Sequence, residues 1–204
     1  MVGLDEGAQS ILGRPLSGTE AGQFNNYLEL LRKWGSVTRL IGSTEPHWIV
    51  ENLLLDSLLF LRLLSPAVRS LLDFGAGAGL PGIPIRIVRP EIELTLLEGR
   101  RRRASFLSTA VRELGLRGAR VINARAEDAL PELRGSFDAV VMRCAGDLDK
   151  TLPIASAFVT PGGIVLASGP PDARPLTGAE WITVPGIGRH TLRRFAMTRV
   201  HSPA

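Results

Sequence analysis

The chain has 204 residues, of which 45% are hydrophobic and 22% are charged, and its formal net charge is +4. This length suits one domain, or one domain with a small extension, and the composition excludes a disordered or fibrous protein. The positive excess is almost all arginine, which permits contact with RNA phosphates but is too small to establish it.

The N-terminal segment, MVGLDEGAQSILGR, differs from a signal peptide. It carries acidic residues where a signal peptide would be basic, and it lacks an apolar run and a cleavage site. A lone cysteine, Cys144, cannot form an internal disulfide or a thiolate metal cluster. The histidines, His47, His190 and His201, show no metal-ligand spacing. We therefore expect a cytoplasmic protein that binds no metal.

Two helices are expected before residue 66. Residues 20–34 place apolar side chains along one helical stripe. A second helix is expected from near Ser43 to Leu64, ended by Ser65-Pro66. Its apolar stretch contains Asp56 and Arg62, so it falls short of the roughly 18 uncharged residues of a membrane helix. We predict that residues 1–66 form a helical N-terminal extension packed on a core domain of residues 67–204.

From residue 69 onwards, short apolar runs alternate with helical stretches, which is typical of a parallel sheet with crossover helices. The expected strands are residues 70–74, 93–98, 119–124, 137–143 and 162–168. The clearest helix between them is residues 100–114, with Gly115 as its C-cap.

After the fifth strand this alternation stops. Residues 180–190 and 192–200 predict two strands joined without room for a crossover helix. The whole pattern predicts an α/β, Rossmann-like fold: a seven-stranded, mostly parallel sheet with helices on both faces. The terminal antiparallel pair is typical of methyltransferases that use S-adenosylmethionine (SAM), whereas a dinucleotide-binding domain normally continues with βα units.

A glycine-rich turn follows the first strand, in the stretch LLDFGAGAGLPGIPIRIV at residues 71–88. In open α/β sheets, ligands bind at this position. The glycines fit two motifs. Gly77, Gly79 and Gly82 give the G-x-G-x-x-G of a dinucleotide site, whereas Gly75, Gly77 and Gly79 give the G-x-G-x-G loop of SAM enzymes. A tight turn without a ligand is a third interpretation.

The prolines in this stretch separate the two motifs. A dinucleotide pyrophosphate needs free backbone N–H groups at the start of the helix, and Pro81 and Pro84 have none. SAM carries no phosphate, so the prolines cost its binding little. The motif that begins at Gly75 is therefore favoured.

Acidic residues end the neighbouring strands. Asp73 closes the first strand, where its carboxylate would balance the amino group of SAM or cap the turn. Glu98 ends the second strand and is placed to accept hydrogen bonds from both ribose hydroxyls, a role shared by SAM and NAD sites. Ala126 and Glu127 follow the third strand, near the expected adenine; the alternative is the N-cap region of a short helix.

Two sets of arginines complete the candidate site. Arg143 ends an apolar strand, where a charge is costly unless it meets an anion or a polar ligand, so we expect a role in the site. Four arginines open the helix after Glu98, against the positive end of its dipole: Arg100, Arg101, Arg102 and Arg103. A bound anion would offset this cost, although a solvated basic turn is equally compatible with the sequence.

Taken together, these motifs resemble the RsmG/GidB family, whose members methylate a guanine N7 of small-subunit ribosomal RNA. The resemblance is carried by DFGAGAGLPGIPIRIVRPEIELTLLE, RxxFL, RAED, FDAVVMR and GRH, and most of all by the unusual G-L-P-G-I-P run. Upstream, LLRKW and LLDSL lie where that family has L-x-K-W and H-x-x-D-S-L. The resemblance thus covers most of the chain.

The resemblance implies SAM as cofactor and small-subunit rRNA, or the 30S particle, as partner, and we expect a monomer. It places Gly75, Gly77, Gly79 and Leu80 around the methionine end of SAM, Glu98 at the ribose, Ala126 and Glu127 at the adenine, and Arg143 between cofactor and substrate. Our hypothesis is that Arg143 donates to guanine O6 or to a nearby phosphate, and that Arg100 to Arg103 hold the RNA backbone.

The chain departs from the family pattern at three positions. It has Gly35 in place of an Asn, Leu53 in place of a His, and Ser168 in place of a Lys that is expected to face the RNA or the target base. The last difference favours an alternative: a SAM-binding protein with another substrate, or a non-catalytic ribosome or RNA binder. An NAD-dependent oxidoreductase is disfavoured by Pro81 and by the lack of a catalytic Tyr/Lys or His/Asp constellation.

Overall fold

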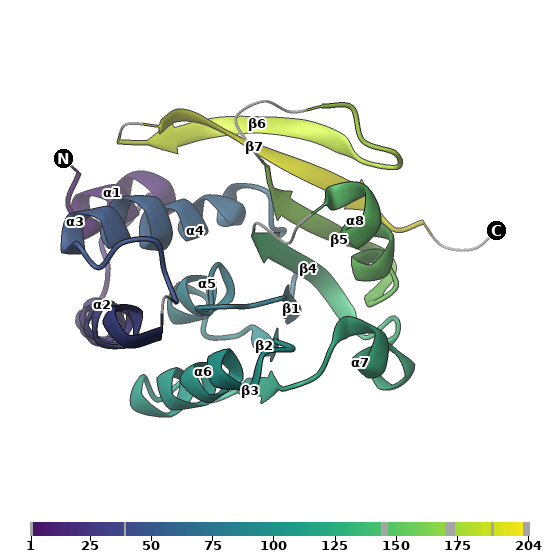
Figure 1. Cartoon of the computed structure of the whole chain (residues 1–204). Helices are drawn as coiled ribbons and strands as arrows, with labels where there is room; N and C mark the ends of the chain where they lie inside the picture. Colours follow the sequence, from purple (N-terminus) through teal and green to yellow (C-terminus); the bar gives the residue numbers. More distant parts are fainter. Residues whose placement is uncertain (1, 39, 144–146, 170–173, 189, 202–204) are drawn as a thin grey trace.

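A computed structural model of the chain describes residues 2–38, 40–143, 147–169, 174–188 and 190–201. Its centre is a seven-stranded sheet of order β3-β2-β1-β4-β5-β7-β6 (Figure 1). The first five strands are parallel to one another, and β7 runs antiparallel to β5 and β6. The strands are β1 (Ser70–Phe74), β2 (Glu93–Leu97), β3 (Ala119–Ile122), β4 (Phe137–Arg143), β5 (Val159–Ser168), β6 (Glu180–Ile187) and β7 (His190–Arg199). The predicted fold class is confirmed.

Helices cover both faces of the sheet (Figure 1). They are α1 (Leu4–Leu12), α2 (Gly18–Thr38), α3 (Pro46–Ile49), the π-helical η1 (Val50–Leu55), α4 (Asp56–Leu58), the 3-10 helix η2 (Leu59–Arg62), α5 (Gly82–Val88), α6 (Arg101–Glu113), α7 (Ala126–Leu133) and α8 (Leu148–Ser156). No helix within the described ranges is long and apolar enough to cross a membrane.

The N-terminal helices differ from the expectation in two respects. The single helix expected up to Leu64 is a succession of α, π, α and 3-10 turns from α3 to η2. Helix α1 was not predicted, because the residues that it buries, Gly7 and Ala8, are too small to produce an apolar pattern. A side chain at Gly7 would collide with Leu55, so this glycine allows α1 to lie close against η1.

The strands alternate their side chains between two apolar layers, as a pleated sheet requires. In β4, Ala139 and Val141 belong to the layer shared with α2 and α5, whereas Val140 and Met142 belong to the layer shared with α7 and α8. The N-terminal helices therefore cover the same face as α5. Asp73 and Arg143 lie on this face, because each is an even number of residues from an apolar residue of this layer.

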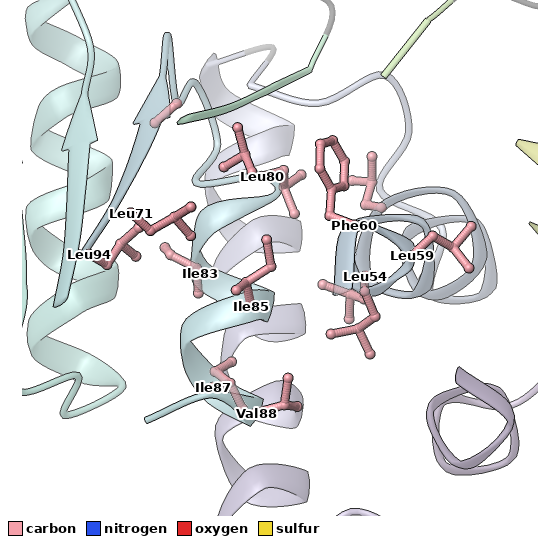
Figure 2. Close-up of a cluster of buried hydrophobic side chains, with 14 of the residues drawn as sticks. Leu54, Leu59, Phe60, Leu71, Leu80, Ile83, Ile85, Ile87, Val88 and Leu94 are labelled. Carbon is pink, nitrogen blue, oxygen red and sulfur yellow. The ribbon is translucent and has the colours of Figure 1, made fainter. Parts of the chain in front are cut away.

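Helix α5 lies between the sheet and the N-terminal helices (Figure 2). Figure 2 shows its apolar side chains between Leu71 and Leu94 of the strands and Leu54, Leu59 and Phe60 of the N-terminal segment. This cluster joins side chains from both sides of residue 66. The division into an extension of residues 1–66 and a domain of residues 67–204 stays a prediction.

The strand order locates the candidate site. The chain leaves β1 towards β2 on one side, and β4 lies on the other side of β1. A crevice for ligands forms at such a reversal, beyond the carboxyl ends of the strands. The predicted site residues at the ends of β1, β2 and β4 all lie at this edge.

Candidate functional site

The glycine loop after β1 adopts the backbone that its sequence predicts. Gly75, Gly77 and Gly79 have φ of 69°, 57° and 82°, values that side-chain-bearing residues rarely adopt. A Cβ at Gly79 would collide with Ile83, so this glycine serves packing. A Cβ at Gly75 would meet no atom within 4 Å, so the backbone there borders open space in which a ligand can approach it closely.

The same loop disfavours a bound pyrophosphate. Gly82, the third glycine of the dinucleotide motif, is the first residue of α5. Its N–H donates to Oδ2 of Asp73 at 2.8 Å and is thus already used within the protein. The conformation of the loop therefore agrees with the motif that begins at Gly75. Leu80 is buried at the amino end of α5 (Figure 2), and its contact with a cofactor stays a prediction.

Asp73 is fully buried beneath the loop. Burial, above all, raises the pKa of its carboxyl from 3.8 to about 7; the Gly82 N–H lowers it, the Glu98 charge raises it, and the Arg143 charge lowers it. One oxygen caps the turn, as the alternative interpretation expected, while Oδ1 has no hydrogen-bond partner among the described residues. A buried carboxylate oxygen without a donor is suited to a cationic ligand, so the predicted role at the amino group of SAM stays open.

The raised pKa of Asp73 predicts a pH-dependent stability. The folded protein holds this proton up to about pH 7, whereas the unfolded chain loses it near pH 3.8. Asp73 therefore imposes no cost below about pH 4. The free energy of unfolding falls as the pH rises from about 4 to about 7, by the order of 1 to 4 kcal/mol, and Asp73 causes no further fall above about pH 7. Urea unfolding at pH 5 and pH 8, without cofactor, measures this fall.

The Asp73→Asn variant is the matched control, because its side-chain oxygen can still accept from Gly82. We expect it to lack the decrease between pH 5 and pH 8. Glu20 does not interfere, because its bond to Arg14 lowers the pKa of its carboxyl to about 2, and it titrates below this range. The same decrease in both proteins would contradict the assignment to Asp73.

Glu98 links the glycine loop to the start of α6. Its side chain is buried, with Oε2 accepting from the Gly77 N–H at 2.9 Å and Oε1 from the Arg100 N–H at 2.7 Å. Each carboxylate oxygen has a second lone pair, so Glu98 can still accept from a ribose hydroxyl. Asn123, which was not singled out from the sequence, donates to the Glu98 backbone carbonyl at 2.8 Å. The ribose role of Glu98 stays a prediction.

Ala126 and Glu127 form the first turn of α7, with Ala126 half-buried and Glu127 exposed. The short helix of the alternative interpretation is therefore present. The loops after β2 and β3 lie side by side, since a Cβ at Gly99 would be 3.5 Å from Cγ of Arg125. This proximity is compatible with one nucleoside spanning Glu98 and Ala126, but the adenine role stays a prediction.

Arg143 finds its counter-ion inside the protein. Its Nη2 donates to the Asn52 carbonyl at 2.9 Å, and its Nη1 lies 3.6 Å from Oδ2 of Asp56. Nη1 is buried and has no hydrogen-bond partner among the described residues, while the Arg143 side chain as a whole is 18% exposed. Asp56 was not predicted as a site residue; its signals in the sequence were a charge within an apolar run and its place in the LLDSL segment, which resembles the H-x-x-D-S-L of the family.

The basic run at the start of α6 remains available to an external anion. Arg100, Arg101 and Arg102 are exposed, and Arg103 is half-buried, with Nη1 3.8 Å from the position of a Cβ on Gly77. None of the ion pairs among the described residues involves these four arginines. Contact with RNA stays a prediction.

Two further expectations from the sequence concern a metal site and residues outside the described ranges. In the described ranges, no group of three or more His, Cys, Asp or Glu side chains could hold a metal ion. Cys144 lies outside these ranges, as does Arg189 of the GRH motif.

The fold and the glycine loop define the class: an α/β protein with the fold of SAM-dependent methyltransferases. Among solved structures, the O-methyltransferase TomG from Streptomyces achromogenes, in complex with SAM, is similar over 98% of this chain and 96% of its own, with a TM-score of 0.60 and 19% identity. At this identity the likeness concerns the fold alone.

Sequence comparisons identify the family. The model of GidB, rRNA small subunit methyltransferase G, matches residues 20–169. Ribosomal RNA small subunit methyltransferase G of Desulfitobacterium hafniense (strain Y51) is 36% identical over 170 residues, which cover 78% of this chain and 70% of the relative. That of Sorangium cellulosum (strain So ce56) is 36% identical over 175 residues, 84% and 73% of the two chains. The chain belongs to the rRNA small subunit methyltransferase G family, which removes the oxidoreductase alternative.

Proposed function

We propose that this protein is a SAM-dependent methyltransferase that modifies a guanine N7 of small-subunit ribosomal RNA. The family match over residues 20–169 carries the proposal, and the site supports it. Open space at Gly75 and the unpartnered Oδ1 of Asp73 suit the methionine end of SAM. Glu98 would hold the ribose, Ala126 and Glu127 the adenine.

The chemistry requires little from the protein beyond placement. SAM supplies a methyl group on a sulfonium, and guanine N7 has a free lone pair, so no general base is needed. The protein contributes by holding N7 in line with the methyl group, which can lower the barrier by several kcal/mol. Arg143 would donate to guanine O6 or to a nearby phosphate. The base must be unstacked to enter, which favours an irregular RNA region.

Ser168 supports the competing proposal of another substrate, or of a non-catalytic ribosome or RNA binder. Ser168 is buried and pairs in register with Arg143, so the lysine of the family pattern is missing beside a proposed catalytic residue. Arg143 still provides a cation at this edge of the sheet, and we therefore favour methylation over the competing proposal.

Labelled SAM distinguishes these functions. We expect transfer of label to small ribosomal subunits that lack the modification, and stabilisation against heating by SAM and S-adenosylhomocysteine but not by NAD. Tight SAM binding without transfer to subunits or to naked rRNA would support the competing proposal. The comparison of naked rRNA with assembled subunits also identifies the substrate form.

Removal of the exposed basic run is expected to weaken RNA binding. The test is the triple variant Arg100→Gln, Arg101→Gln and Arg102→Gln. Its slope of log RNA affinity against log salt concentration should be smaller in magnitude by about 2, because up to three phosphate contacts are lost. SAM affinity should change less than about twofold. Filter binding at several salt concentrations measures the slope.

A control variant removes the same charge elsewhere: Arg32→Gln, Arg112→Gln and Arg134→Gln, three arginines that are also exposed. Equal slopes in the two triple variants would show that only net charge matters and would contradict a defined RNA contact at residues 100–102.

The expected compartment and oligomeric state are also part of the proposal. We propose a cytoplasmic enzyme that acts as a monomer. Light scattering on the purified protein measures its mass in solution, and a dimer would contradict this part.

A further inference from the structure

A single carboxylate holds two arginines where the N-terminal helices meet the carboxyl edge of the sheet. Asp56, in α4, is 3% exposed. Its Oδ1 lies 2.6 Å from Nε of Arg193, and its Oδ2 accepts from Nη2 of the same guanidinium at 2.8 Å. The same Oδ2 is 3.6 Å from Nη1 of Arg143. The pairing with Arg193 is bidentate and close, and the pairing with Arg143 is longer.

These three charges come from elements that are far apart in the sequence. Arg143 ends β4, Arg193 is in β7, and Asp56 is in the N-terminal helical segment. The β6–β7 hairpin also packs on this segment, because a Cβ at Gly188 would collide with Glu51. Asp56 thus sits where the N-terminal segment, the hairpin and β4 converge.

The charges continue towards the glycine loop. The Arg143 charge acts on the buried Asp73, so Asp73, Arg143, Asp56 and Arg193 form an alternating series from the loop to β7. Pairing with the arginines, and above all the bidentate pairing with Arg193, offsets the burial of the Asp56 carboxylate. Arg143 in turn needs an anchor, because its Nη1 has no hydrogen-bond partner in the described structure and its long side chain has several rotamers.

We propose that Asp56 is a positioning residue: held by Arg193, it sets the guanidinium of Arg143 at the carboxyl edge of the sheet, where the exposed part of the Arg143 side chain meets the RNA substrate. This inference rests on the proposed function. Asp56 does not touch substrate or cofactor in this view. It acts on the transfer step only through Arg143, and Arg193 keeps Asp56 in place.

A double-mutant cycle tests the inference. The variants are Asp56→Asn, Arg143→Ala and their combination, and the measurements are kcat and KM for RNA transfer, Kd for SAM, and Tm. We expect Asp56→Asn to lower kcat/KM about 10-fold or more and to leave Kd for SAM within about twofold. Because Asp56 acts through Arg143, the combined variant should be no slower than Arg143→Ala alone.

Asp138→Asn controls for a purely structural effect. Asp138 accepts from the N–H groups of Arg69 and Ser70 at 2.8 and 2.9 Å, at the opposite end of β1. Its loss should lower Tm and leave kcat/KM unchanged. If Asp56→Asn does not fold, Arg193→Gln, which releases Asp56 from its bidentate contact, replaces it in the cycle.

The outcomes separate the two proposals. The inference is overturned if the wild type is active and Asp56→Asn transfers methyl groups equally well. It is also overturned if the losses of the two single variants multiply in the combined variant. Either result leaves the proposed function in place. A wild type that binds SAM but transfers no methyl group to small-subunit RNA overturns the proposed function, and the inference with it.

Discussion

Replacement of Gly75 by alanine is expected to weaken SAM binding by roughly 100-fold, or about 3 kcal/mol. The new methyl group would occupy the open space beside the loop, where no protein atom lies within 4 Å and where the proposed cofactor contacts the backbone. Isothermal titration with SAM measures the loss.

Gly13→Ala is a closely matched control. Gly13 and Gly75 both have φ of 69°, and a Cβ would meet no atom within 4 Å at either position. Both variants should therefore lose a similar stability of roughly 1 to 2 kcal/mol from backbone strain. Only Gly75→Ala should lose SAM affinity. Equal SAM affinity in the two variants would contradict the cofactor site at this loop.

The second large effect is expected at Arg143. Arg143→Ala should lower kcat/KM for methyl transfer to RNA by about 100-fold, the usual scale for loss of one preorganised donor, and change the Kd for SAM by less than about threefold. The fold should persist, because Asp56 keeps its bidentate partner Arg193. Single-turnover transfer of labelled methyl, with SAM binding measured in parallel, separates the two quantities.

Arg14→Ala is the control for Arg143→Ala, because it also removes an arginine that pairs with a carboxylate. Arg14 binds both oxygens of Glu20 at 2.6 and 2.8 Å, near the start of α2. This variant should lose stability without slowing transfer. If Arg143→Ala lost SAM affinity and transfer equally, Arg143 would be a cofactor residue and not a substrate residue.

The strands were predictable because their signals are local. Alternation between apolar runs and helical stretches gave β1 and β4 at their observed bounds and placed β2 and β3 to within two residues. The helix types were harder to predict from the sequence. The change from α to π to 3-10 between Pro46 and Arg62 depends on packing against α5 and the β6–β7 hairpin, and apolar periodicity does not report such packing.

The candidate site was predicted in its residues but not in its contacts. Asp73 and Glu98 were identified by their position after strands, yet their bonds to Gly82, Gly77 and Arg100 depend on how the loop folds back. Arg143 was expected to need an anion. That the anion is Asp56, 87 positions earlier in the printed sequence, could not be inferred from local pattern.

The sequence by itself determined the fold class, the family and the glycine loop, because these follow from periodicity and from residues adjacent in the chain. The two prolines of LLDFGAGAGLPGIPIRIV already favoured SAM over a dinucleotide, and the Gly82 N–H bond to Asp73 adds a second reason. Only the tertiary structure decided the partners of the charged groups. Which carboxylate meets Arg143 depends on the packing of segments distant in the chain, because a buried charge must be paired wherever the fold brings an opposite charge close to it.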